Sequence, residues 1–186
     1  MPMHRSFRVL LVFAVFCGVA GGDVASAQRP TGAVITLPGT TYAPVPNVTI
    51  GGDASLTYKF AWAFSATADS AGQVTPGLLA PARVLNTLVA DGVPAERIHL
   101  AIVARGPAAV DLLDNAAYRA IKGRDNPNLP LLRELAAKGV RLIVCGQTVM
   151  GMKLPRDGYP SFVLVSRAAT VAQARLAAEG FVFNPF

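Results

Sequence analysis

Cys145 is the residue with the clearest capacity for covalent chemistry. It ends the apolar run Leu142–Val144 and precedes Gly146, a pattern that predicts a buried strand ending in a thiol. Open α/β sheets bind their ligands where such strands end. A reactive Cys145 could attack sulfane sulfur, whereas an unreactive one would be a small apolar core residue or a disulfide link between subunits.

A reactive cysteine needs a local cause for ionisation. The ordinary pKa of a cysteine is about 8.5, so only a small fraction is thiolate at neutral pH. About 1.4 kcal/mol of favourable interaction with the thiolate lowers the pKa by one unit, so one or two well-placed groups are enough. The candidates are the backbone N–H groups of Gly146–Val149, the guanidinium of Arg105, and Lys153 or Arg156.

A second expected strand ends at Arg105, before a Gly-Pro pair that can start a helix. Helix N-termini favour anions, so a positive site here would suit thiosulfate, sulfite or polysulfide. The alternative is an arginine that caps a carboxylate or faces water. The predicted substrate-binding residues are Arg105, Gly106, Gly146, Gln147 and Thr148, with Cys145 as the catalytic residue.

Other site chemistries are not supported by the sequence. His99 lies near the start of its strand, at the opposite end of a parallel sheet from the thiol, so a cysteine-histidine pair is not expected. The aspartates Asp111, Asp114 and Asp125 are explained as caps and turn residues, and no zinc set is present. Gly106–Ala108 lacks the glycine spacing of a dinucleotide loop. We therefore expect no metal and no cofactor.

The N-terminus has the features of a secretory signal. Val9–Ala20 is apolar, Ala25–Ala27 fits a cleavage site, and the preceding basic residues are His4, Arg5 and Arg8. The pattern predicts a signal peptide over residues 1–27 and a periplasmic or secreted product. The alternative of a lipid anchor at Cys17 is disfavoured because Phe16, which is not small, precedes it.

The remaining chain shows neither a nucleic-acid signature nor a membrane span. The full sequence carries a net charge of +6, but its basic residues are spread singly and are not interleaved with aromatic residues. No segment after the signal is long and apolar enough to cross a bilayer. We expect no nucleic-acid partner and no membrane insertion after cleavage.

Residues 28–55 differ in composition from the rest of the chain. They are rich in proline and glycine and have no helical or strand period, which predicts an extended arm. This arm would lie on the domain or on a neighbouring subunit, or would be partly disordered. A single α/β domain is expected over residues 56–186.

Hydrophobic patterning within 56–186 alternates strands with helices. Thr75 is expected to cap the first helix, which Pro81 should kink or delay. Residues 146–161 are expected to form a polar connection, and Ser166 is expected to cap the last helix. The expected strands are 58–66, 98–104, 141–145, 162–165 and 181–183. This order predicts a three-layer sandwich with a mostly parallel sheet of about five strands.

Four motifs occur in an order and spacing that resemble the DsrE/DsrF-like family, in particular its exported, single-domain branch. They are Thr75-Pro76-Gly77-Leu78, Gly106-Pro107-Ala108, Asn115-Ala116-Ala117-Tyr118-Arg119 with Gly123–Asn128, and Val144-Cys145-Gly146-Gln147. The family includes sulfur-relay carriers. In these, a cysteine at the position that Cys145 matches holds a persulfide, and the proteins tend to form homo-oligomers, so the resemblance implies a homo-oligomer here.

Two positions depart from the family pattern. Exported relatives commonly have Val-His-Gly-Pro where this chain has Ala104-Arg105-Gly106-Pro107, so a histidine is replaced by a fixed positive charge. The apolar continuation after the carriers' cysteine is replaced by Gly146-Gln147-Thr148. The resemblance implies a periplasmic sulfur-handling protein with a persulfide on Cys145 and anionic sulfur compounds or a thiol protein as partners. The alternative is a non-catalytic binding or assembly module in which Cys145 is structural.

Overall fold

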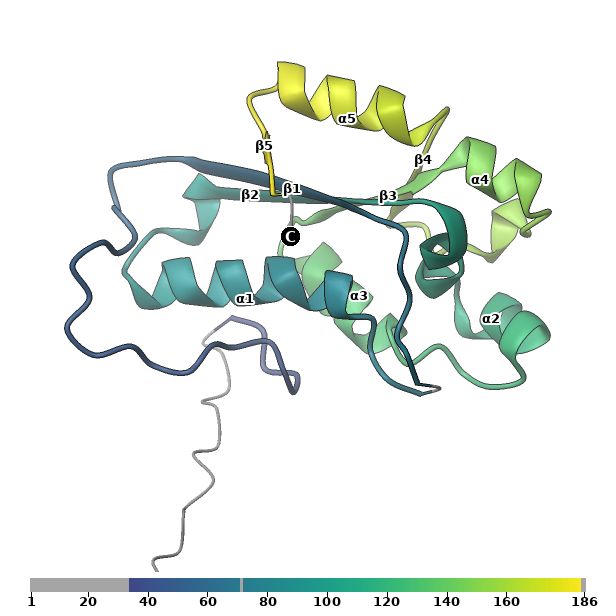
Figure 1. The fold of residues 1–186 in the computed structure, drawn as a ribbon, viewed down its shortest axis with the longest axis horizontal. Coiled ribbons are helices and arrows are strands. Elements are labelled where there is room, and N and C mark those ends of the chain that lie inside the picture. Colours follow the sequence, from purple (N-terminus) through teal and green to yellow (C-terminus); the bar gives the residue numbers. More distant parts are fainter. Residues whose placement is uncertain (1–33, 71, 185–186) are drawn as a thin grey trace, which may run out of the picture.

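The fold is a five-stranded parallel sheet with helices on both faces (Figure 1). The computed structural model describes residues 34–70 and 72–184. The predicted signal peptide lies outside the described residues. Among the described residues, no helix has both the length and the apolar character needed to cross a membrane.

The sheet has the strand order β4-β3-β2-β1-β5, and every neighbouring pair is parallel. The strands are β1 (Tyr58–Phe64), β2 (Ile98–Ala104), β3 (Arg141–Cys145), β4 (Val163–Ser166) and β5 (Val182–Phe183). The predicted α/β sandwich with five parallel strands is therefore confirmed. Six of the seven residues of β2 are buried, because this central strand is covered on both faces.

Helices connect the strands and form the two outer layers. The α-helices are α1 (Pro76–Ala90), α2 (Asn115–Lys122), α3 (Leu129–Ala137), α4 (Gly146–Gly151) and α5 (Ala169–Ala178), and the 3-10 helices are η1 (Ala95–Arg97), η2 (Gly106–Leu112) and η3 (Arg156–Gly158). Figure 1 shows α5 on one face of the sheet and α1 with α3 on the other.

Alternation along β3 divides its side chains between two hydrophobic cores. Leu142 and Val144 pack in the larger core with residues of α1, α3 and η2. Ile143 and Cys145 face the smaller core, which contains Leu176 of α5. Cys145 therefore lies in the α5 layer, because successive side chains of a strand point to opposite faces.

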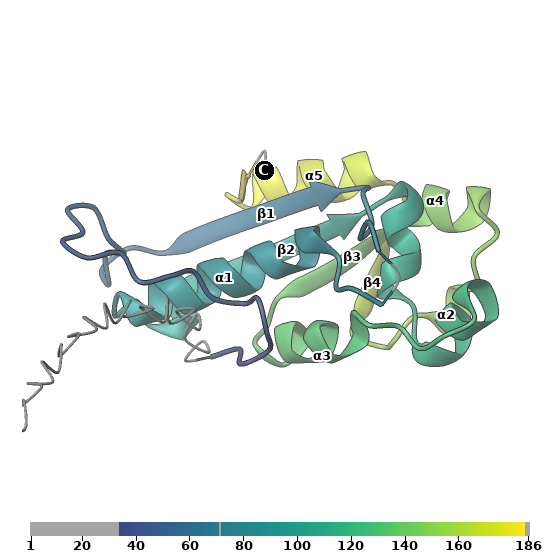
Figure 2. The ribbon, with the colours of Figure 1, turned by 60° about the horizontal axis from the view of Figure 1, so that its bottom comes forward.

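The described part of the N-terminal arm lies along α1 (Figure 2). Ile35 is fully buried in the larger core. The buried Asn86 of α1 accepts hydrogen bonds from the N–H groups of Val34 and Ile35, and donates to the carbonyls of Ile35 and Thr40. Hydrogen bonds to the Asn86 side chain thus satisfy backbone N–H and C=O groups of this segment that secondary structure would otherwise satisfy.

A buried polar network joins three connections near the start of α1. The Thr75 hydroxyl donates to the Asp111 carboxylate at 2.7 Å, and the Thr75 N–H donates to Asn128 at 2.8 Å. Asn126 donates to the carbonyls of Asp111 and Leu113 and accepts from the N–H of Asn128. Thr75 occupies the predicted N-cap position, but its hydroxyl serves this network instead of capping α1.

Two local expectations were wrong, and a third was wrong in part. The segment 146–161 was expected as a polar loop connection, but it begins with α4, whose first residue follows Cys145 directly. Ser166 ends β4, and its hydroxyl donates to the carbonyl of Ala168, which is the residue that precedes α5. Pro81 does not delay α1, which starts at Pro76 and runs through it, while the expected kink at Pro81 stays a prediction.

Candidate functional site

Cys145 lies at the carboxyl end of β3, where three strand-to-helix connections meet. It is the only cysteine among the described residues, and it is a free thiol. The residue is 5% exposed and packs beside Ala169, the first residue of α5. In the sheet register Cys145 is opposite Ser166, so the ends of β3 and β4 bring the thiol next to the start of α5.

Hydrogen bonds lower the pKa of the Cys145 thiol. Burial by itself raises this pKa, but the hydroxyl and N–H of Thr148 and the N–H groups of Ala169 and Gln147 outweigh burial. The Ala169 N–H lies 3.2 Å from the sulfur. These donors belong to the first turns of α4 and α5, and N–H groups at helix N-termini stabilise a thiolate.

The hydroxyl of Thr148 joins the thiol to the connection after β2. It accepts a hydrogen bond from the Gly106 N–H at 3.1 Å. A hydroxyl has one proton to donate and two acceptor positions. Because the Gly106 N–H occupies an acceptor position, the proton of Thr148 remains free for the sulfur of Cys145.

Gly146 allows the backbone to turn from β3 directly into α4. A Cβ atom at this position would lie 2.6 Å from the carbonyl oxygen of Ser166, which is closer than real Cβ contacts. The absence of a side chain therefore keeps the end of β4 against the first turn of α4. Gly106 has a φ of 54°, in the left-handed region that favours glycine.

The structure brings together most, but not all, of the residues predicted for this site. Gly106, Gly146, Gln147 and Thr148 all contact the thiol or its immediate surroundings. The Arg105 N–H donates to the carbonyl of Phe64, and its side chain is exposed with no hydrogen bond or ion pair to any described residue.

Charged side chains do not contribute to the lowered pKa of Cys145. The groups that shift it are the four hydrogen-bond donors and burial. Lys153 and Arg156, which were candidates for this role, are exposed beyond the end of α4. His99 is at the amino end of β2, away from Cys145. Backbone N–H groups and the Thr148 hydroxyl therefore lower the pKa of Cys145, without the cation that was expected to contribute.

Ala169 is a site residue that the sequence alone did not indicate. Alanine has no reactive group, and its contribution is a backbone N–H that carries no residue-type signature. The parallel order of β3 and β4 was the available signal, because it places the end of β4, and so the start of α5, beside Cys145.

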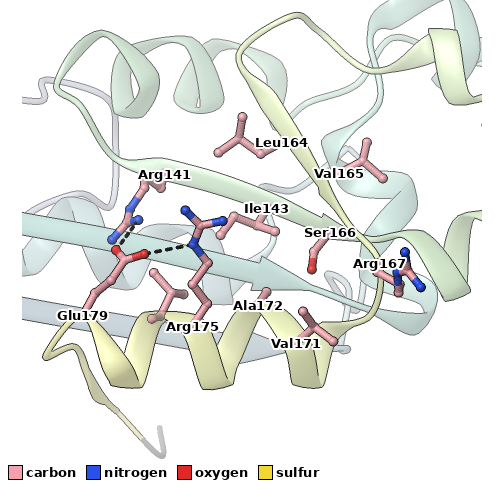
Figure 3. A pocket seen from close by; sticks show the side chains of 11 residues that line it. Arg141, Ile143, Leu164, Val165, Ser166, Arg167, Val171, Ala172, Arg175 and Glu179 are labelled. Carbon is pink, nitrogen blue, oxygen red and sulfur yellow. Dashed lines mark hydrogen bonds and ion pairs between the residues drawn. The ribbon is translucent and has the colours of Figure 1, made fainter.

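A groove of about 390 Å³ lies next to this site, between β4 and α5 (Figure 3). Its floor is apolar and includes Ile143 and Ala172, while Arg141, Arg175 and Arg167 line its sides. Glu179 bridges two of these guanidiniums, accepting from Arg141 at 2.7 Å and from Arg175 at 3.2 Å. Cys145 is not one of the lining residues.

The described residues offer no group of three or more histidine, cysteine, aspartate or glutamate side chains that could hold a metal ion. The arrangement around Cys145 is instead suited to holding a negative charge on sulfur, because four donors converge there.

The model of the DsrE/DsrF-like family matches residues 51–184. A protein of unknown function, MTH1491 from Methanobacterium thermoautotrophicum, is similar with 22% identity and a TM-score of 0.47, covering 67% of this chain and 97% of that one. The ychN protein from E. coli is similar with 16% identity and a TM-score of 0.47, covering 69% and 100% of the two chains.

A search of curated proteins found no match. The family match extends over all five strands and includes Cys145, so it covers the whole domain that carries the site. This family suggests a role related to sulfur relay. The chain belongs to the DsrE/DsrF-like family.

Proposed function

We propose that this protein is exported and handles sulfur in the periplasm or outside the cell, carrying sulfane sulfur as a persulfide on Cys145. The observation that carries the proposal is the set of four hydrogen-bond donors that converge on one free thiol and lower its pKa. Export is supported by the signal-like pattern of residues 1–27.

The proposed reaction uses only thiolate chemistry. The Cys145 thiolate attacks the outer sulfur of thiosulfate, forming an S–S bond, and the S–S bond of thiosulfate breaks so that sulfite leaves with its electron pair. The product is a persulfide anion on Cys145. An acceptor thiolate then attacks the outer sulfur of the persulfide, which forms the acceptor's persulfide and restores the Cys145 thiolate. Charge and electrons balance in both steps without an added oxidant.

Intact-mass measurement tests this proposal. The chain without residues 1–27 is incubated with thiosulfate, or with inorganic polysulfide, and then with glutathione as acceptor. We expect a gain of one sulfur atom, its loss after glutathione, and no gain in Cys145→Ser. The same chain unfolded in urea is the matched control, and it should react more slowly because only the fold lowers the pKa of Cys145. Equal rates in the folded and unfolded chains, or an equal gain in Cys145→Ser, would refute the proposal.

A second candidate is a non-catalytic binding or assembly module of the same fold. The observation that favours it is the 5% exposure of Cys145, which is typical of a packed core residue. Under this alternative, the folded protein resists both sulfur donors and iodoacetamide, while the unfolded chain is alkylated normally. Faster alkylation of the folded chain than of the unfolded chain would rule out this alternative function.

A further inference from the structure

The groove between β4 and α5 is positively charged. Arg141, Arg167 and Arg175 contribute three positive charges, and Glu179 contributes one negative charge, which leaves the groove with a net positive charge. Figure 3 shows the linked Arg141, Glu179 and Arg175 toward one end and Arg167 at the other. Arg167 forms no ion pair with any described residue. The groove is therefore electrostatically complementary to an anionic ligand.

The same region exposes apolar side chains on both faces of β4. Leu164 is 51% exposed on the α5 side, where it pairs with Ile143, and Val165 is 39% exposed on the opposite side. Val171 of α5 is also 51% exposed and lines the groove. Apolar exposure that wraps around an edge strand is typical of a surface that binds another chain.

Within residues 34–70 and 72–184, no strand pairs with the outer edge of β4. The N–H of Val163 donates to the carbonyl of Pro160 at 2.8 Å, so Val163 faces away from β3. Residues two apart in a strand direct their N–H and C=O groups to the same side. The N–H and C=O of Val165 therefore also face outward, at the open edge of the sheet.

We propose that this edge and groove bind an extended, acidic segment of a partner protein, which adds a strand to the sheet beside β4. Backbone hydrogen bonds to Val165 supply the pairing, as in other cases of strand addition. Alternate acidic side chains of the segment point to the α5 side and reach Arg167 and Arg175, and the apolar ones between them point to the opposite side and cover the exposed Val165. The binding itself does not require Cys145 to react.

The position of this surface also places the bound segment near the thiol. Ser166, the last residue of β4, is opposite Cys145 in the register. If the proposed function is correct, a thiol carried at the end of such a segment would approach the same edge of the sheet. This approach of a partner thiol rests on the proposed function, whereas the binding of the segment does not.

The probe for the experiment is the capped peptide acetyl-Glu-Val-Glu-Val-Glu-amide, added to isotope-labelled protein without residues 1–27. We expect saturable changes in the amide signals of β4, and slower hydrogen exchange of the Val165 N–H at saturation. The same peptide methylated on its backbone nitrogens should bind at least tenfold more weakly, because it cannot donate to β4. Equal binding of the methylated peptide would overturn strand pairing.

Charge is tested with variants and with a second peptide. Arg167→Gln combined with Arg175→Gln should weaken the binding of the acidic peptide at least tenfold, and a lysine-valine peptide should bind the native protein at least tenfold more weakly. Arg133→Gln, an exposed position of α3 on the other face of the sheet, is the matched control and should change binding less than twofold.

Two further results would overturn the proposal. One is no change in β4 amides at saturating peptide. The other is a Val165 N–H already protected in the free protein by a second copy of the chain, detected as concentration-dependent exchange together with a dimer in sedimentation. Failure of the persulfide experiment would leave the peptide result unaffected, so the two proposals fail independently.

Discussion

The backbone N–H of Ala169 donates a hydrogen bond to the sulfur of Cys145 across 3.2 Å. This contact joins the end of β3 to the start of α5, two elements that meet because β4 pairs with β3. The N-terminus of a ten-residue helix is thereby directed at the thiol. A thiolate at this position is stabilised by the helix and protected by it from bulk water.

Removal of the Thr148 hydroxyl should raise the pKa of Cys145. Thr148→Val keeps the shape of the side chain and the backbone N–H, but it deletes one of the donors that lower this pKa. We expect iodoacetamide alkylation at pH 7 to slow several-fold and the alkylation profile to move to higher pH. Thr148→Ser retains the hydroxyl and should behave like the native protein. Identical profiles for the valine and serine variants would contradict a role for the hydroxyl.

A methyl group at Gly146 should destabilise the protein. The Cβ atom of Gly146→Ala would lie 2.6 Å from the Ser166 carbonyl oxygen, and both groups are backbone or rigidly attached to it. Overpacking of this kind costs about 1–3 kcal/mol in the free energy of unfolding, which urea denaturation measures. Gly151→Ala, in the same helix but with nothing within 4 Å, is the control and should not destabilise. Similar stabilities for the two variants would show that β4 moves away without cost.

The stability of the protein should depend on pH through Asp111. Burial raises the pKa of this carboxyl, and the hydrogen bond from Thr75 and the charge of Lys122 only partly oppose burial. A raised pKa means that the folded state binds the proton more tightly than the unfolded state. The resulting stabilisation is fully present below the unfolded pKa of about 3.9 and is lost as the pH rises through the folded pKa.

Asp111→Asn isolates this effect because it removes the titrating group. We expect the native protein to gain stability relative to Asp111→Asn as the pH falls from 7 to 3. Urea denaturation at a series of pH values measures the difference. A difference that is constant over this range, or that changes in the opposite direction, would contradict the raised pKa.

Loss of the Asn86 amide should release the N-terminal arm. Asn86→Ala removes four hydrogen bonds to residues 34–40, several of them buried. At about 1 kcal/mol for each of the stronger bonds, the expected loss in free energy of unfolding is about 3 kcal/mol. Limited proteolysis should then cut within residues 34–50. Thr87→Ala, the exposed neighbour, should leave both stability and proteolysis unchanged.

Much of the architecture was predictable from the sequence because it is encoded in local patterns. The apolar runs of β2 and β3 and the glycines that end the helices define strands and helices within a short window. The alternation of those elements was enough to predict a parallel sheet. The same reasoning located Cys145 at a strand end, and the four motifs identified the family.

Local patterns were misleading where long-range contacts decide the conformation. The segment Gly146–Gly151 has a weak helical signal, yet it forms α4, whose first residue packs so closely against the carbonyl of Ser166 that only glycine fits there. The Thr75 hydroxyl, a typical cap, is drawn into a buried network with Asp111. In both cases the deciding partner is far away in the sequence.

The sequence by itself determined the fold class, the family and the thiol that could react. The tertiary structure decided what surrounds that thiol. It left Arg105 exposed and without a described side-chain partner, and directed N–H groups of α4 and α5 at the sulfur. Side-chain charge can be read from a sequence, but the direction of a backbone dipole depends on how the elements pack, and here the dipoles set the chemistry of Cys145.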